Sequence, residues 1–376
     1  MKPVSPFAKP TSIQVACIHS TQEFETLRSE WTRLLKKSLI QDAFLTWEWN
    51  YAWWQAYSEG NELWLLIARD AEGLKGIAPL VLVKKVKNGI HSRILCSLGD
   101  ESLDVGGFIV PDGSLEIYAA FADFLKANQQ HWDVLELNEF LLDDPGISTL
   151  IDTFRGRGLA SYIKEKHHYF IPIHGIWQDY LGHLSSSMRS DLKSHHTRLI
   201  KQHKIDYIHH RGAQVASQDL ASIYQINSQG KYAYLYRSKQ EKVFQESLRT
   251  LMSAKGWMDV HLLFINGLPA AYYSGFYFED RYEDWRKGFD PRFAEFSPGS
   301  ILMMFLLEDA FQQGCHEFDF LRGDEKYKIR WKTSDRLYAQ IQIVSPIKVI
   351  HWLIYLFLPK FKRFLKGISQ RNTINK

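Results

Sequence analysis

The residue types best suited to chemistry gather in one stretch near the end of the chain. Asp319 stands between two phenylalanines at the end of a predicted strand, and the run GDEKYK follows at residues 323–328. Open α/β sheets place ligands at strand ends that lie near a helix N-terminus. We predict Asp319 or Glu325 as the general base toward an attacking amine or hydroxyl. Tyr327 is the predicted acid for a leaving thiolate, and Lys328 the predicted anion-binding residue. A surface turn with salt bridges is the alternative interpretation.

A helix start upstream of this stretch predicts an anion-binding site. Ser297 is a good N-cap, Pro298 suits the first helical position, and Gly299 lets a ligand approach the backbone. The unpaired N–H groups and the positive dipole end of such a helix favour phosphates. An ordinary helix start is the alternative.

The elements that must position these residues occur twice along the chain. Each half contains two helical segments, three strands that form an antiparallel meander, a helix and a further strand. Asn88-Gly89 and Asn266-Gly267 are the hairpin signals that recur in the same place. The expected elements of the first half are helices 23–37 and 47–57, strands 62–68, 76–85 and 91–98, helix 114–128 and strand 132–137. Those of the second half are helices 218–229 and 240–254, strands 258–265, 268–278 and 282–288, helix 298–313 and strand 317–321.

A meander followed by a helix crossover predicts a mixed sheet with helices on its faces. The fold class is therefore α/β, with two tandem units that each have a central mixed β-sheet flanked by helices. The expected domains are a disordered tail at residues 1–10, a first unit at 11–175, a second at 176–345, and an amphipathic basic tail at 346–376. A basic helix at residues 184–204 begins the second unit, with Met188, Leu192 and Leu199 as its apolar stripe. Its cations face either solvent or an anionic ligand.

The segment from Asn266 to Lys332 resembles the acetyltransferase domain of the CelD/BcsL family, a branch of the GNAT superfamily. The matching runs are INGLPAAYYSGFYF, GFDPRFAEFSPGSILMM and, above all, FDFLRGDEKYKIRW. The resemblance covers residues 177–342 well and extends more weakly to Trp47-Glu48-Trp49, as in the tandem arrangement of Fem-type transferases. The GDEKYK run is fairly specific, whereas the SPG helix start is much less so.

This resemblance implies acyl transfer from acetyl-CoA to an amine or hydroxyl of a sugar or cell-envelope precursor. It places the pyrophosphate at the helix start, with Ser297, Gly299, Ser300 and Gly323 as donor-binding residues. The usual GNAT pyrophosphate loop, Q/R-x-x-G-x-G/A, is absent from the sequence. One alternative is a Fem-like transferase that takes its acyl group from aminoacyl-tRNA, which the basic helix would suit. Another is a non-catalytic scaffold at the membrane.

The amino-acid composition argues against several classes of function. The net charge of +4 argues against bulk nucleic-acid binding, and the 3 cysteines form no CxxC pair, which fits a reducing, cytoplasmic compartment. The 15 histidines lack metal-ligand spacing, so no metal site is predicted. The C-terminal segment 349–358 is apolar and is followed by cations, a pattern of interfacial helices. Peripheral contact with an anionic inner membrane face and docking onto the domains are both open.

Overall fold

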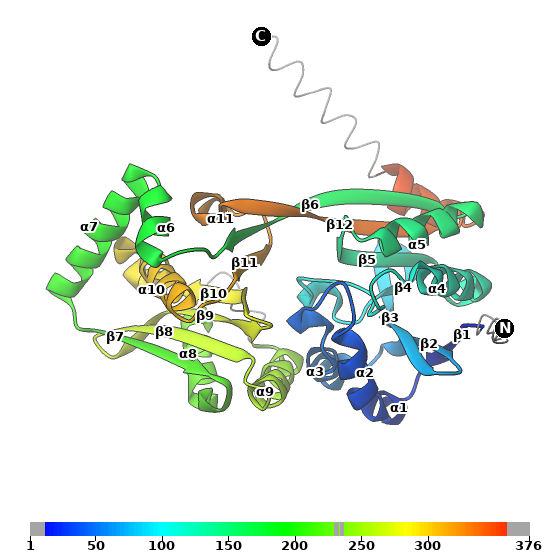
Figure 1. Ribbon diagram of the computed structural model, residues 1–376, viewed down its shortest axis with the longest axis horizontal. Helices are drawn as coiled ribbons and strands as arrows, with labels where there is room; N and C mark the ends of the chain where they lie inside the picture. Colours follow the sequence, from blue (N-terminus) through cyan, green and yellow to red (C-terminus); the bar gives the residue numbers. More distant parts are fainter. Residues whose placement is uncertain (1–11, 229–232, 234–236, 359–376) are drawn as a thin grey trace, which may run out of the picture. The chain divides into compact units, whose positions relative to one another are not determined.

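The computed structural model describes residues 12–228, 233 and 237–358, which fall into two compact units (Figure 1). Unit 1 is built from the described parts of residues 1–41, 60–165 and 339–376. Unit 2 is built from residues 42–59 and 166–338. These boundaries differ from those expected at 175/176 and 345/346, because the chain changes units within two strands. The predicted tail at 1–10 and the cations after residue 358 lie outside the described residues.

Unit 1 contains a mixed sheet in the order β1-β2-β3-β4-β5-β12-β6. Its strands are antiparallel from β1 to β4, and β4 pairs with β5 in parallel. Helices α4 and α5 pack on one face through Phe121, Leu150 and Phe154, and α1 and α2 bury Phe24 and Trp31. The elements are β1 (Gln14–Ile18), α1 (Thr21–Thr26), α2 (Arg28–Leu35), β2 (Glu62–Asp70), β3 (Gly73–Lys87), β4 (Ile90–Ser97), α4 (Leu115–Ala127), β5 (Val134–Leu141), α5 (Pro145–Gly156), β6 (Ala160–Pro172) and β12 (Ser334–Val344).

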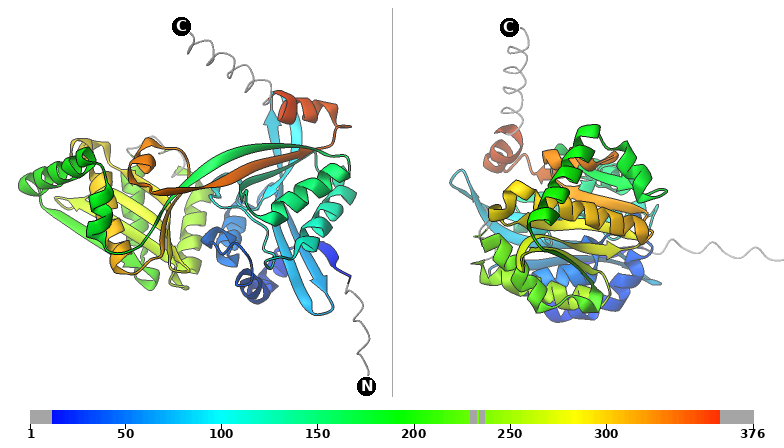
Figure 2. Two further views of the ribbon diagram at one scale, coloured as in Figure 1. Left: turned by 45° about the horizontal axis from the view of Figure 1, so that its top comes forward. Right: turned by 90° about the vertical axis from the view of Figure 1, so that its left-hand side faces the viewer.

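Unit 2 repeats this plan with the order β6-β11-β10-β9-β8-β7. Helix α10 lies on one face of β8 to β10 beneath α6 and α7, and α8 and α9 lie on the other face (Figures 1 and 2). Helix α3 packs against α9, so an early segment belongs to this unit. The elements are α3 (Trp47–Tyr57), α6 (Trp177–His183), α7 (Ser186–Gln202), β7 (Ile205–Arg211), α8 (Ser217–Ser228), α9 (Lys239–Ser253), β8 (Met258–Ile265), β9 (Leu268–Phe278), β10 (Arg281–Phe289), α10 (Pro298–Gln312), β11 (Glu317–Arg322) and α11 (Lys326–Trp331).

The predicted fold class is confirmed, and the hairpin turns show why the halves match. Asn88 and Gly89 have φ angles of 51° and 76°, and Asn266 and Gly267 have 50° and 76°. Two successive positive φ angles are the geometry of the tight hairpin turn that Asn-Gly favours. The order β2-β3-β4-α4-β5 in unit 1 therefore recurs as β8-β9-β10-α10-β11 in unit 2.

The last strand of each repeat is exchanged. β6 follows β5 along the chain and pairs with β11 in unit 2, whereas β12 follows β11 and neighbours β5 in unit 1. Sequence patterns did not predict either strand, because ASYIKEKHHYFIP and SDRLYAQIQIV mix charged and apolar residues without flanking hairpin signals. Strands β1 and β7 and helices α5, α6 and α11 were also not predicted.

The structure describes the predicted basic helix and part of the predicted C-terminal segment. Met188, Leu192 and Leu199 are buried in α7, which confirms its apolar stripe. Of the predicted C-terminal segment, the structure describes α12 (Val349–Trp352) and a π-helical turn, Leu353–Phe357. No helix within the described residues has both the length and the apolar composition that crossing a bilayer requires.

Candidate active site

The candidate site lies where two parallel strands of unit 2 separate. The ladder between β10 and β11 runs from Arg281 opposite Glu317 to Glu283 opposite Asp319, and within the described residues it ends there. β10 then contains an irregularity against β9, and β11 contains one against β6, with φ of 58° at Leu321. Strand backbone released from its ladder can pair with an extended ligand.

Asp284 is the first residue of β10 beyond this ladder. Its side chain is fully buried, and its Oδ2 accepts a hydrogen bond from Lys287 Nζ at 2.8 Å. Its Oδ1 is buried and has no hydrogen-bond partner among the described residues. Burial raises the pKa of Asp284 above its ordinary value, although Lys287 acts in the opposite direction. A buried carboxylate with a raised pKa and one open oxygen is suited to accept a proton.

Glu325 and Lys328, at the start of α11, lie close to each other and to Asp284. Lys328 Nζ lies 3.1 Å from Glu325 Oε2 and 3.4 Å from the carbonyl oxygen of Leu321, and it also donates to the carbonyl of Arg322. The Lys328 side chain is only 1% exposed, whereas that of Glu325 is 55% exposed. Burial and the nearby Lys287 together lower the pKa of Lys328. Lys328 therefore ties the end of β11 to α11 and adds positive charge to the site.

Two tyrosines connect these groups to the start of α10. Tyr273 donates a hydrogen bond from its hydroxyl to the Gly299 carbonyl at 3.2 Å, and its pKa is raised by burial and by Asp284. Lys287 Nζ lies 5.5 Å from the centre of the Tyr327 ring. We call Tyr273, Asp284, Lys287, Glu325, Tyr327 and Lys328 the Asp284 cluster.

The start of α10 differs in detail from the expected cap. Ser297 has φ of 51°, in the left-handed region rather than the extended region typical of N-caps, and makes no side-chain capping hydrogen bond. Its N–H closes the preceding 3₁₀ turn on the Ala294 carbonyl. Pro298 occupies the first turn, as predicted. A Cβ at Gly299 would meet nothing closer than 3.9 Å, so packing leaves room there. Ser300 follows in the first turn, where its N–H bonds to the Ser297 carbonyl at 3.0 Å.

Gly323 has a local structural role. Its φ is 109°, and a Cβ at this position would lie 2.4 Å from Glu325 Oε2. The glycine therefore allows the Glu325 carboxylate to turn back toward Lys328.

Asp319 belongs to a different group of charges. Its Oδ1 accepts from the Leu321 N–H at 2.7 Å, and its Oδ2 lies 3.7 Å from Arg336. Beside it, Arg281 lies 2.7 Å from Asp42 and 2.6 Å from Glu283. Burial and Asp42 raise the pKa of Glu283 well above its ordinary value. These contacts stabilise the paired part of β10 and β11 and attach Asp42 to unit 2. Of the four predicted catalytic residues, Glu325, Tyr327 and Lys328 thus belong to the Asp284 cluster, and Asp319 does not.

The sequence-based search missed Asp284, Lys287 and Tyr273. The signal for Asp284 is present in the run YEDWRKGF, where two adjacent acids stand among aromatic residues in a predicted strand. The same reasoning selected Asp319 in FDF. Only the end of the β10–β11 ladder distinguishes the two acids.

A domain model and several solved structures match this arrangement. The model described as an acetyltransferase (GNAT) domain matches residues 186–329, which include the whole Asp284 cluster. The structure of FemX is 11% identical, with a TM-score of 0.61, over 90% of this chain and 99% of that one. A tandem GNAT protein from the clavulanic acid biosynthesis pathway is also 11% identical, with a TM-score of 0.51, over 88% and 98% of the two chains.

The chain has a GNAT-like fold. A conserved protein of unknown function from Bacteroides thetaiotaomicron shares it, at 10% identity and a TM-score of 0.52, over 88% of this chain and 100% of that one. No curated protein gives a significant match to the sequence. The predicted tandem GNAT architecture is thus confirmed at the level of the fold. The assignment to the CelD/BcsL family stays a prediction.

Proposed function

We propose that the protein transfers an acetyl group from acetyl-CoA to an amine or hydroxyl of a saccharide or other cell-envelope precursor. The observation that carries this proposal is Asp284, a buried carboxylate with an open oxygen at the end of the β10–β11 ladder. The matching GNAT domain model supports the reaction class. The sequence resemblance motivates the acetyl donor and the class of acceptor.

In the proposed reaction Asp284 removes the proton from the acceptor as the acceptor attacks the thioester carbonyl. The new bond to carbon forms, the carbon–sulfur bond breaks, and the departing thiolate takes a proton from Tyr327. Lys287 and Lys328 stabilise the oxyanion that develops on the carbonyl. Glu325, which is more exposed, orients the acceptor and assists proton removal. Correct alignment of the two substrates supplies most of the remaining acceleration.

The donor pyrophosphate is proposed to lie at the first turn of α10, near Ser297, Gly299 and Ser300. Three features support this: the helix dipole, the open space at Gly299, and the Tyr273 hydrogen bond that joins this turn to the Asp284 cluster. Gly323 is proposed to act indirectly, by shaping the loop that carries Glu325.

Calorimetric titration of acetyl-CoA into the full chain tests the donor. We expect micromolar binding by acetyl-CoA and by free CoA, and loss of binding in Gly299→Asp because a carboxylate would repel the pyrophosphate. Gly156→Asp is the matched control, since Gly156 also has open space around it but lies in α5 of unit 1. Absence of binding to the unmodified protein would reject acetyl-CoA as the donor.

A Fem-like aminoacyl-tRNA donor is the second candidate. It is favoured by a shallow hollow on α7 that Lys193, Arg198 and Lys201 line together with four polar residues. A polyanionic donor bound there would show steep salt dependence, and Lys193→Ala with Lys201→Ala would reduce its slope. A non-catalytic scaffold remains the proposal if neither donor binds.

We also propose that the C-terminal segment contacts an anionic membrane surface from the cytoplasmic side. Ile347, Val349 and Ile350 are exposed, at 89%, 60% and 51%. Ile354 and Tyr355 are buried in unit 1, and Lys348 lies 2.8 Å from Asp133. The segment is thus anchored on one side and presents apolar side chains on the other.

A further inference from the structure

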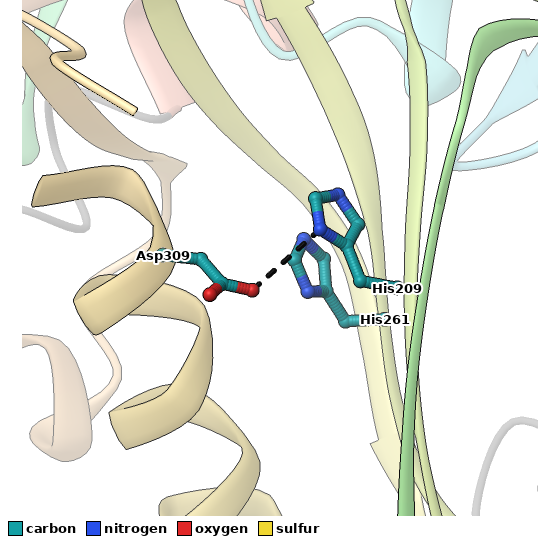
Figure 3. Close-up of side chains that lie close together, drawn as sticks. All are labelled: His209, His261 and Asp309. Atoms are coloured by element: carbon teal, nitrogen blue, oxygen red, sulfur yellow. Dashed lines mark ion pairs between the residues drawn. The ribbon is translucent and has the colours of Figure 1, made fainter. Parts of the chain in front are cut away.

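A second cluster of side chains in unit 2 lies outside the Asp284 cluster. His209 in β7 is the cross-strand partner of His261 in β8, and Asp309 reaches them from α10 (Figure 3). One ligand atom from each residue lies within 4.8 Å of the others. His209 Nδ1 is 3.5 Å from Asp309 Oδ2. Two imidazoles and one carboxylate are a common ligand set for zinc and related ions.

Asp259 contacts both imidazole rings at their Nε2 atoms. Its Oδ2 lies 3.1 Å from His209 Nε2, and its Oδ1 lies 2.5 Å from His261 Nε2. Arg211 Nε, at 2.5 Å, neutralises this buried carboxylate. With both Nε2 atoms turned to Asp259, the Nδ1 atom of His209 faces Asp309 and that of His261 faces the Tyr207 hydroxyl. Metal-binding histidines usually contact a carboxylate through their other nitrogen in this way.

Tyr207 occupies the space between the remaining ligand atoms. Its hydroxyl lies 2.7 Å from His261 Nδ1 and donates a hydrogen bond to Asp309. Tyr207 therefore keeps His261 and Asp309 facing each other.

Burial and access both suit an ion. The His261 side chain is only 1% exposed, so the surrounding packing fixes the position of its ring. The side chains of His209 and Asp309 are 21% and 26% exposed, which gives an ion a path from solvent.

We propose that His209, His261 and Asp309 form a binding site for a zinc-type divalent transition-metal ion, with Asp259 as the residue that orients both histidines. Metal–ligand distances of about 2.1 Å in a tetrahedral site place neighbouring ligand atoms about 3.4 Å apart. The separation of His209 from Asp309 already fits. The two imidazole rings are stacked, with their centroids 4.0 Å apart, so the His209 ring must tilt away from His261 on binding. The Tyr207 hydroxyl, which contacts both His261 Nδ1 and Asp309, must also shift to admit the ion, and the fourth position falls to this hydroxyl or to water.

The ion would fasten strand β7 to the C-terminal half of α10, whose first turn adjoins the Asp284 cluster. This role is independent of acyl transfer. It also predicts preference for zinc-type ions over Mg²⁺ or Ca²⁺, which favour sites made of oxygen atoms alone.

Metal titration of the full, untagged chain after chelator treatment tests the site. We expect one equivalent of Co²⁺ to bind with the visible absorption of a nitrogen- and oxygen-ligated ion, and Zn²⁺ to displace it. Asp309→Asn and His209→Asn should each weaken binding by about 100-fold or more. His210→Asn is the matched control, because His210 is the next residue of β7 but contacts Asp219 instead.

A second readout separates site loss from misfolding. Zn²⁺ should raise the unfolding temperature of the unmodified protein and of His210→Asn, but not that of Asp309→Asn. Circular dichroism of the metal-free variants should match that of the unmodified chain. The proposal is overturned if the unmodified protein binds no Co²⁺ at micromolar concentrations, or if His210→Asn loses as much binding as the ligand variants.

Discussion

The two units differ at the end of their parallel strand pair. In unit 1 the β4–β5 ladder ends at Cys96 opposite Glu136. Beyond this point a later segment of unit 1 pairs with β5 in place of β4. Gly106 forms a parallel bridge with Phe140 and donates its N–H to the Glu139 carbonyl at 2.7 Å. A Cβ at Gly106 would lie 2.2 Å from the Asn138 carbonyl oxygen, so only glycine fits. Unit 1 thus closes its own opening with a buried loop.

In unit 2 the corresponding ladder ends at Glu283 opposite Asp319, and charged side chains follow. The next residue is Asp284, where unit 1 has Ser97. The loop before α10 forms a 3₁₀ turn, Pro291–Phe296. One scaffold therefore supports a packed, closed copy and a copy with a buried acid and cations. The domain match to residues 186–329 covers the second copy only.

The largest expected difference concerns Asp284 and Ser97. Asp284→Asn should reduce acyl transfer by about 100-fold or more, because it removes the proposed base. Ser97→Ala, at the matching position of unit 1, should leave the rate unchanged. Release of free thiol from acetyl-CoA with a panel of amine and hydroxyl acceptors measures both. Equal rates in the two variants would remove Asp284 from the mechanism.

The same substitution has a second, opposite effect on stability. The pKa of folded Asp284 is raised above 3.8, so the folded state binds more protons than the unfolded state between pH 3.8 and the folded pKa. The carboxyl therefore destabilises the fold progressively across this range and fully above it. Asp284→Asn should therefore unfold at equal or higher urea concentration than the unmodified protein at pH 7, and this advantage should shrink as the pH falls toward 3.8. A marked loss of stability at pH 7 would show that Asp284 is a structural residue.

A pair of glycine substitutions tests which copy is closed. Gly106→Ala should destabilise unit 1 by about 3 kcal/mol, because its Cβ would overlap the backbone oxygen of Asn138. Gly299→Ala in unit 2 should change stability little, since its nearest neighbour would be 3.9 Å away. Urea unfolding followed by circular dichroism measures both. Similar losses would mean that the start of α10 is packed as tightly as the unit 1 loop.

The smallest expected effect concerns the C-terminal segment of unit 1. Ile350→Asp should weaken sedimentation with vesicles rich in anionic lipid several-fold, because it places a charge on the exposed apolar side. Val86→Asp, also exposed and in the same unit, is the control. Unchanged sedimentation of Ile350→Asp would remove the membrane proposal and leave this segment as a docked helix.

Local patterns in the sequence were sufficient for the repeated elements. Hairpin signals at Asn88-Gly89 and Asn266-Gly267, and apolar runs such as residues 258–265, predict strands because turn geometry and strand burial are properties of neighbouring residues. The apolar stripe of α7 follows from helical periodicity in the same way. Glu325, Tyr327 and Lys328 could be chosen together because they lie within four consecutive residues at the start of α11.

Tertiary structure alone decided which distant residues share a site. The exchange of β6 and β12 depends on pairing between segments far apart in sequence, which no local pattern encodes. Asp284 and Asp319 look alike in sequence, and only the end of the β10–β11 ladder puts the first in the Asp284 cluster and the second beside Arg336. His209, His261 and Asp309 likewise converge only because two strands and a helix pack together. The sequence determined the elements and their order, whereas long-range backbone pairing and burial determined the chemistry available to each side chain.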